Sequence, residues 1–132
     1  MILSDGSVSI ALNDDLQWTD RDWSGIVESV SYALANGVLP APVIIKRNAR
    51  CGRPMTLAST SDYFGCIQYA AFASLKVLAE SNPETLTLTG LGGTWNVQFR
   101  YAEEPVSGEP VLGVTQYADD EWWSVVIRLR II

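Results

Sequence analysis

Few residues in this sequence have the type and spacing that enzyme chemistry requires. The chain contains no histidine, which excludes a Ser-His-Asp triad, a Cys-His pair and a His-ligated zinc site. The run GLGG at positions 90–93 lacks the spacing and the lysine of a phosphate-binding loop. Cys51 and Cys66 are too few for a disulfide scaffold. We interpret them as reduced thiols, and a Cys51–Cys66 pair stays open.

Carboxylates are the remaining candidates for chemistry. Asp20-Arg21-Asp22 offers the oxygen ligands that a divalent ion prefers, as in some sugar transferases. So short a pattern is common by chance, however, and 132 residues leave little room for such an enzyme. A glycosidase needs two carboxylates beside the sugar bond, and nothing among the fifteen acids singles out a pair. We therefore predict a protein that is not an enzyme, with no catalytic residues, cofactor or metal site.

Five tryptophans in so small a chain raise the possibility of sugar binding, because exposed aromatic faces stack on sugar rings. Aromatic side chains also bury large areas in protein cores and anchor protein interfaces. Trp95 alternates with apolar residues and is predicted to lie in the core. Trp18, Trp23, Trp122 and Trp123 fit either interpretation, and we favour core or protein interface over sugar.

Charge and composition restrict the partners of this chain. Its length indicates a single domain, residues 1–132. The net charge of −6 argues against a surface that grips nucleic acid. Basic residues cluster only at Lys46, Arg47, Arg50 and Arg53, which we interpret as a solvated strand end and loop. The N-terminus lacks a signal peptide pattern, and no apolar run approaches the ~20 residues that span a bilayer. We expect synthesis in the cytoplasm and no membrane partner.

Local patterns predict a mainly antiparallel α+β domain. A helix is expected from about Cys66 to Glu80, where apolar residues recur at helical spacing. Strands are expected where apolar residues alternate, at 7–12, 26–34, 55–57, 85–89, 95–101 and 122–132, and at the continuous apolar run 43–45. Asn36-Gly37 is a strong hairpin signal, whereas 13–23 and Ala102 to Glu121 are expected to be loops. The predicted fold is a β-sandwich of about seven strands with one flanking α-helix.

The last predicted strand has two unequal faces. One face is entirely apolar and belongs in a core; it consists of Trp123, Val125, Ile127, Leu129 and Ile131. The other carries Trp122, Arg128 and Arg130, and arginines among apolar groups are frequent at protein interfaces. The acids that would pair with them are Glu103, Glu104, Asp119 and Asp120. We predict these seven residues as a candidate protein interface. A salt bridge within the same chain is an equal alternative for the arginines.

The order of several short motifs along the chain resembles that of small tail proteins of tailed bacteriophages. The motifs are an N-terminal DG before an alternating strand, W-x-x-x-D-W at Trp18 to Trp23, GRPMTL at Gly52 to Leu57, VQFRY at Val97 to Tyr101 and the final WWSVVIRLRII. This resemblance implies a virion protein of the tail tip, baseplate or distal tail, with a tail-tube-like fold and no catalytic residues.

The resemblance also implies partners. Such proteins assemble as rings, so the expected partners are copies of this chain and other phage tail proteins. DNA would pass through the assembly without sequence-specific contact, and an acidic surface that lined the channel would repel it. The alternative function from a different class is a small carbohydrate- or receptor-binding module, in which several tryptophans would lie exposed on one platform.

Overall fold

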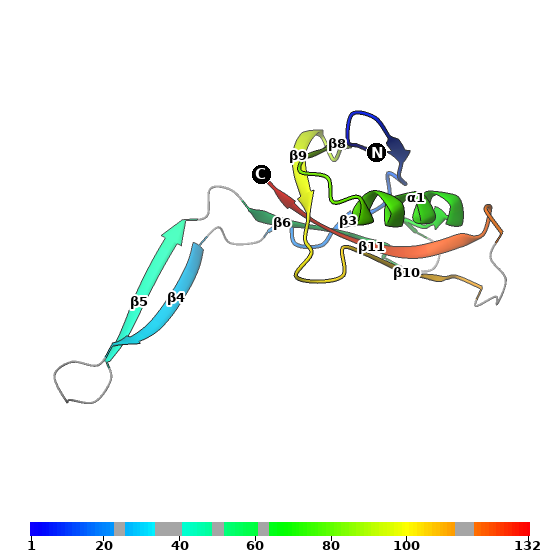
Figure 1. Cartoon of the computed structure of the whole chain (residues 1–132). Helices are drawn as coiled ribbons and strands as arrows, with labels where there is room; N and C mark the ends of the chain where they lie inside the picture. The colour runs from blue at the N-terminus through cyan, green and yellow to red at the C-terminus, as the bar shows by residue number, and fades with distance from the viewer. Residues whose placement is uncertain (23–25, 34–40, 49–51, 61–63, 113–117) are drawn as a thin grey trace.

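The computed structural model describes residues 1–22, 26–33, 41–48, 52–60, 64–112 and 118–132. These residues form one helix and eleven strands, so the predicted α+β class with mostly antiparallel strands is confirmed (Figure 1). The elements are β1 (Ile2–Ser4), β2 (Ser9–Ala11), β3 (Gln17–Trp18), β4 (Ile26–Ala33), β5 (Ala41–Asn48), β6 (Arg53–Ala58), β7 (Ile67–Gln68), α1 (Tyr69–Glu80), β8 (Leu86–Gly90), β9 (Gly93–Phe99), β10 (Val106–Pro110) and β11 (Trp122–Ile131).

Nine of these strands form one open sheet. Its order is β2-β1-β8-β9-β11-β6-β3, and β10 and β7 also pair with β11. Every strand pair in the sheet is antiparallel. The remaining strands, β4 and β5, form a separate two-stranded sheet. The predicted count of about seven strands was too low. Three of the strands that were not expected, β1, β3 and β7, have only two or three residues and are too short to show alternation, and the fourth, β10, contains Gly108 and Pro110.

Strand β11 is the centre of the large sheet. One of its edges pairs with β7 at Trp122 and Trp123 and with β6 from Val126 to Ile131. Its other edge pairs with β10 from Trp123 to Ile127 and with β9 from Leu129 to Ile131. Both backbone edges of β11 are therefore occupied along most of its length. This strand does not offer an unpaired edge on which another chain could build sheet.

The apolar face of β11 lies in the core, as predicted. Val125, Ile127 and Leu129 are at most 1% exposed, and Trp123 is 6% exposed. Helix α1 covers this face, since the rings of Phe72 and Trp123 stack with their centroids 4.7 Å apart. The other core residues of the helix are Leu75, Leu78 and Ala79. Aromatic stacking of this kind adds about 0.5–1.5 kcal/mol to the burial of the two rings.

Helix α1 begins at Tyr69, three residues later than expected, because Ile67 and Gln68 pair with β11 as strand β7. Its first residues have no side-chain cap. The N–H groups of Tyr69 and Ala70 instead donate to the backbone oxygens of Glu121 and Asp119, which satisfies donors that a helix start leaves unpaired. The start of the helix is thereby tied to the segment that leads into β11. Among the described residues, no helix is long and apolar enough to cross a membrane.

Two tight turns show why particular residues occur where they do. Leu91 and Gly92 connect β8 to β9 with φ of +54° and +81°, the positive values that a two-residue hairpin turn of type I′ requires. The Asp5 carboxylate accepts hydrogen bonds from the backbone N–H groups of Val8 and Ser7 in the turn between β1 and β2. The bond from Val8, followed by that from Ser7, lowers the pKa of Asp5 below its ordinary value.

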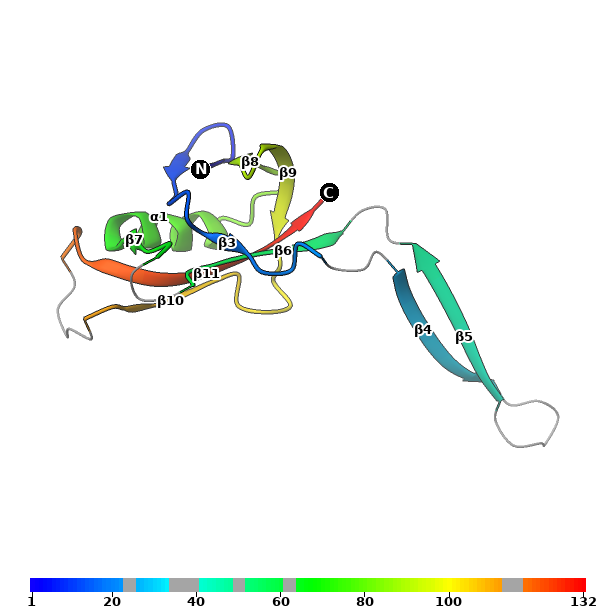
Figure 2. The same ribbon diagram turned by 180° about the vertical axis from the view of Figure 1, so that it is seen from behind.

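Strands β4 and β5 form a hairpin that extends away from the body of the protein, as Figures 1 and 2 show from opposite sides. Eight residue pairs align the two strands, from Ile26 with Asn48 to Ala33 with Ala41. Among the described strands, each pairs only with the other. The predicted hairpin is confirmed, while its expected turn at Asn36-Gly37 lies outside the described residues.

Two segments expected to be loops contain strands. β3 lies within 13–23 and pairs with β6, and β10 lies within Ala102–Glu121 and pairs with β11. Strand β10 includes Gly108 and Pro110, both poor strand formers. Glycine is needed at 108, because an added Cβ would lie 2.7 Å from the backbone oxygen of Ser124. The close approach of the neighbouring strand therefore determines this residue, and no pattern within β10 reveals it.

Candidate functional site

The structure brings together Arg128, Glu103 and Glu104 from the predicted interface. Arg128 donates from Nη1 to the backbone oxygen of Glu104 at 2.7 Å, and its Nε lies 3.1 Å from Oε2 of Glu103. The Glu104 carboxylate turns instead to Lys76 of α1, at 2.9 Å. Of the two alternatives for Arg128, the salt bridge within the chain is thus present. This arginine ties the segment before β10 to the central strand.

The same face of the sheet carries a second polar cluster around Thr56. The Asp20 carboxylate accepts hydrogen bonds from the N–H of Thr56 at 2.8 Å and from its hydroxyl at 2.9 Å. Arg100 donates to the same hydroxyl at 2.6 Å and lies 3.8 Å from the Glu103 carboxylate. Asp20 therefore holds the segment around β3 against β6. Among the residues that the structure describes, no group of three possible ligands could hold a metal ion.

Arg130 does not join this network. It is opposite Gln98 of β9 and Pro54 of β6 in the sheet register. Its Nε is buried and has no hydrogen-bond partner within the described part of the chain. It borders a hollow of about 280 Å³ together with Glu84 and Gln98. Arg128 and Arg130 were predicted to act together, but they have different surroundings.

The described tryptophans have three different environments. Trp123 is core, as its stacking on Phe72 shows. Trp18 and Trp95 are partly buried and pack edge to face, with centroids 5.5 Å apart. Trp95 is therefore at the margin of the core, while Trp23 lies outside the described residues. Trp122 differs from these, since 53% of its surface is exposed.

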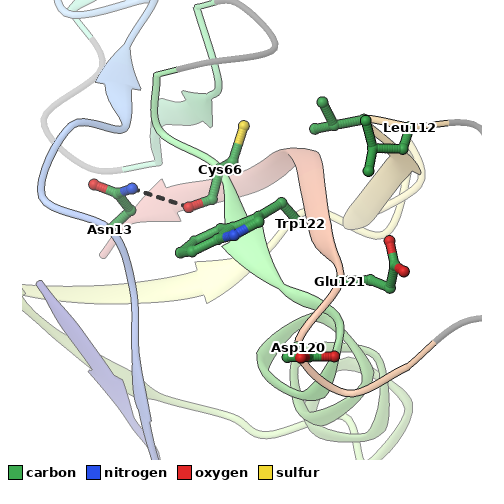
Figure 3. Close-up of a pocket in the computed structure, with 7 residues that line it drawn as sticks. Asn13, Cys66, Leu112, Asp120, Glu121 and Trp122 are labelled. Atoms are coloured by element: carbon green, nitrogen blue, oxygen red, sulfur yellow. Dashed lines mark hydrogen bonds between the residues drawn. The ribbon is translucent and has the colours of Figure 1, made fainter.

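Trp122 lines a pocket of about 490 Å³ at the start of β11 (Figure 3). In the close-up, its indole lies between the Asn13–Cys66 side of the pocket and the side formed by Leu112 and Glu121. Leu112 is 77% exposed, so the apolar part of the pocket is open to solvent. The full lining is Asn13, Cys66, Val111, Leu112, Asp120, Glu121 and Trp122. Its volume falls within the ~300–1,000 Å³ that is usual for ligand pockets.

Several elements fix the geometry of this pocket. Trp122 is held by its pairing with Gln68 of β7, and its backbone oxygen accepts from the N–H of Val111 at 3.1 Å. Asn13 donates from Nδ2 to the backbone oxygen of Cys66 at 2.9 Å, and its Oδ1 accepts from the N–H of Asp15 at 2.9 Å. A second hollow of about 320 Å³ also includes Trp122 in its lining. The indole thus borders two hollows and is positioned by backbone contacts.

The rim of the Trp122 pocket is acidic. Asp120 and Glu121 line it, and Asp119 precedes them. No salt bridge involves these three carboxylates within the described residues. An apolar floor with an uncompensated acidic rim suits a partner that presents apolar and positively charged groups, which is the arrangement found in many protein interfaces.

The sequence predicted only part of this site. Trp122 and Asp120 were expected at an interface, but they lie at the opposite end of β11 from Arg128. Asn13, Cys66 and Leu112 were not predicted as site residues. Asn13 and Cys66 are 53 residues apart in the chain, and no local pattern links them. Leu112 follows β10, and that strand was itself not expected.

Comparison of the chain with protein-family models, with curated proteins and with solved structures found no match.

Proposed function

We propose that this protein is a non-enzymatic structural protein that assembles with copies of itself into a ring of a bacteriophage tail, at the tail tip, baseplate or distal tail. The phage assignment rests on the order of motifs described above. The proposal includes a β-sandwich related to that of tail-tube and distal-tail proteins. The antiparallel sheet and its single helix support this relation, although the sheet of one chain is open. The expected partners are the same chain and neighbouring tail proteins in the virion.

The β4–β5 hairpin is the observation that carries the assembly proposal. A two-stranded hairpin is at best marginally stable in water unless it packs against something else. Within the described strands, this hairpin pairs with no other strand, and it extends from the body (Figures 1 and 2). Its outer backbone edges are also unpaired there, which natural proteins normally protect. A neighbouring subunit would supply both the packing and the protection.

Light scattering coupled to size-exclusion chromatography, over a wide range of concentrations, tests self-assembly. We expect the mean mass to rise with concentration above 14.5 kDa for one chain, and we expect closed rings in negative-stain electron microscopy. A Gly-Ser segment in place of residues 26–48 should abolish the rise. A full-length protein that stays monomeric at every concentration, alone and with its neighbouring tail proteins, would contradict the proposal.

A second candidate function is carbohydrate binding, which the exposure of Trp122 favours. Its ring is half exposed beside Asp120 and Asn13, and aromatic faces next to hydrogen-bonding groups suit sugar rings. Only one of the described tryptophans is exposed in this way, whereas a sugar-binding platform usually presents several. Titration calorimetry with a panel of bacterial surface oligosaccharides would distinguish the two functions. Saturable binding that Trp122→Ala removes would favour the carbohydrate module.

A further inference from the structure

We propose that the Trp122 pocket of one copy receives the β4–β5 hairpin of a neighbouring copy. The inference rests on the proposed self-assembly and specifies the two surfaces that meet. The Trp122 pocket is defined as above by its seven lining residues, with Asp119 beside its rim. Nothing within the described part of the same chain fills it.

Charge supports this pairing of surfaces. Residues 26–48 contain one acid, Glu28, and two bases, Lys46 and Arg47, so their formal charge is +1. The rest of the chain carries −7, since the total is −6. Glu28 is opposite Lys46 in the hairpin register, whereas Arg47 is opposite Val27, so Arg47 is the base that has no acid directly opposite it. The hairpin is thus a segment of positive net charge that complements the acidic rim of the pocket. Complementary charges of this kind steer association and fix its register.

The polarity of the two surfaces also matches. The pocket presents Trp122, Leu112 and Val111, and tryptophan is one of the residue types enriched among those that contribute most binding energy at interfaces. Strand β5 has the sequence APVIIKRN, in which three consecutive large aliphatic residues precede the two bases. The sequence of this strand thus combines the apolar and positively charged residue types that complement the apolar floor and the acidic rim of the pocket.

The positions of the two surfaces exclude contact within one chain and favour a head-to-tail arrangement. The hairpin leaves the body next to Arg53, which is opposite Ile131 at the end of β11. The pocket lies at Trp122, where β11 begins. Nine residue steps of about 3.3 Å place these ends roughly 30 Å apart. Figures 1 and 2 show the hairpin pointing away from the start of β11. Head-to-tail contacts between different surfaces close into rings or continue as filaments.

A charge-exchange experiment with the full-length chain tests the proposal. The pocket variant carries Asp120→Lys and Glu121→Lys, and the hairpin variant carries Lys46→Glu and Arg47→Glu. Each variant alone should weaken self-association about tenfold or more, because both copies then present like charges at the contact. Mixing the two variants should restore assembly, since each then meets an oppositely charged surface. The combined variant should also assemble, at the net charge of the original chain.

A control separates the contact from a general effect of charge. The control variant carries Glu80→Lys and Glu84→Lys. It changes the net charge as much as the pocket variant does, at two exposed positions, the last residue of α1 and the segment that follows it. This control should assemble normally. Trp122→Ala should weaken assembly about 30-fold, as expected for a central interface residue, with an unchanged circular dichroism spectrum.

The outcomes distinguish this inference from the proposed function. If the chain assembles and the pocket variant assembles equally well, the hairpin contacts another surface and the inference is wrong, while the ring proposal stands. If the pocket variant and the Glu80/Glu84 control lose self-association equally, the effect is one of general charge, and the proposed contact between pocket and hairpin is wrong. Oligosaccharide binding at Trp122 without any effect on assembly would assign the pocket to a sugar. A chain that never self-associates would overturn the proposed function itself.

Discussion

Replacement of Arg128 by methionine should destabilise the protein far more than the same replacement of Arg130. Methionine keeps an unbranched apolar side chain of similar reach, so the change removes mainly the charge and its hydrogen bonds. Arg128 loses its bond to the backbone oxygen of Glu104 at 2.7 Å and its ion pair with Glu103 at 3.1 Å. Arg130 has neither kind of partner among the described residues.

The magnitude follows from the two shorter contacts of Arg128, since its third contact, from Nη1 to the Ser107 hydroxyl, is long at 3.4 Å. A hydrogen bond from a charged donor contributes about 1.5–3 kcal/mol. The ion pair adds at most about 0.5 kcal/mol, because the Glu103 side chain is 56% exposed and solvent screens it. We therefore expect Arg128→Met to lower the free energy of unfolding by about 2 kcal/mol, or Tm by about 7 °C for a domain of this size. Arg130→Met removes a buried Nε that has no hydrogen-bond partner among the described residues, so it should not lower the free energy of unfolding.

Urea unfolding followed by tryptophan fluorescence measures both variants, at a concentration low enough to avoid assembly, which would add stability. Glu103→Gln is the matched control for the ion pair and should cost less than about 1 kcal/mol. Equal losses for Arg128→Met and Arg130→Met would refute the argument, because they would show that the contacts of Arg128 with Glu103 and Glu104 add no stability. A larger loss of unfolding free energy for Arg130→Met than for Arg128→Met would mean that Arg130, and not Arg128, makes the contact that stabilises the fold.

Three further changes test other parts of the fold. Gly108→Ala should cost about 1–3 kcal/mol in thermal unfolding, because its Cβ would lie 2.7 Å from the backbone oxygen of Ser124; an unchanged Tm would show that β10 can move away. Tyr101→Phe should cost about 1 kcal/mol through loss of the 2.5 Å hydrogen bond to the Ala79 oxygen. Burial raises the pKa of Tyr101, so stability should fall as the pH rises above about 10, and urea midpoints should show a weaker fall in the phenylalanine variant. The pKa of Asp5 is lowered in the folded state, so its contribution is present above about pH 4 and is lost as the pH falls further. Asp5→Ala should reduce this acid-dependent loss, and a variant with the same acid profile would argue against the turn hydrogen bonds.

The elements that the sequence predicted correctly are those whose own residues carry enough information. Strand β11 has ten residues, and every second one from Trp123 onward is apolar, so its buried face could be identified before its partners were known. The β8–β9 hairpin was predicted for a similar reason, since alternation flanks its turn residues, and the β4–β5 hairpin was predicted from the Asn36-Gly37 turn signal. Short strands such as β3 and β10 depend on the partner that they pair with, and that partner is distant in sequence. Gly108 illustrates this, because its strand neighbour explains a residue that local propensity disfavours.

The candidate site was predicted less completely than the fold. The acids and arginines were recognised, but their pairing depends on which end of β11 each one reaches. Arg128 forms an ion pair with Glu103 because β10 pairs with β11 and brings the segment before it close to Arg128. Asp120 instead lines the pocket beside Trp122, at the start of β11. Asn13 is held at the pocket by its hydrogen bond to the backbone oxygen of Cys66, which is 53 positions away in the sequence. Contacts of this kind depend on tertiary structure, and periodicity cannot reveal them.

The central place of β11 has a consequence for biosynthesis. Strands β6, β7, β9 and β10 all pair with β11, yet a ribosome makes each of them before residues 122–131. The large sheet cannot be completed until β11 has left the exit tunnel. Nascent chains that stop before Trp122 would expose the apolar faces that β11 normally covers, and such chains are prone to aggregate. Only chains that include residues 122–131 could then complete the large sheet, so the position of this strand delays completion of the sheet until these residues have been made.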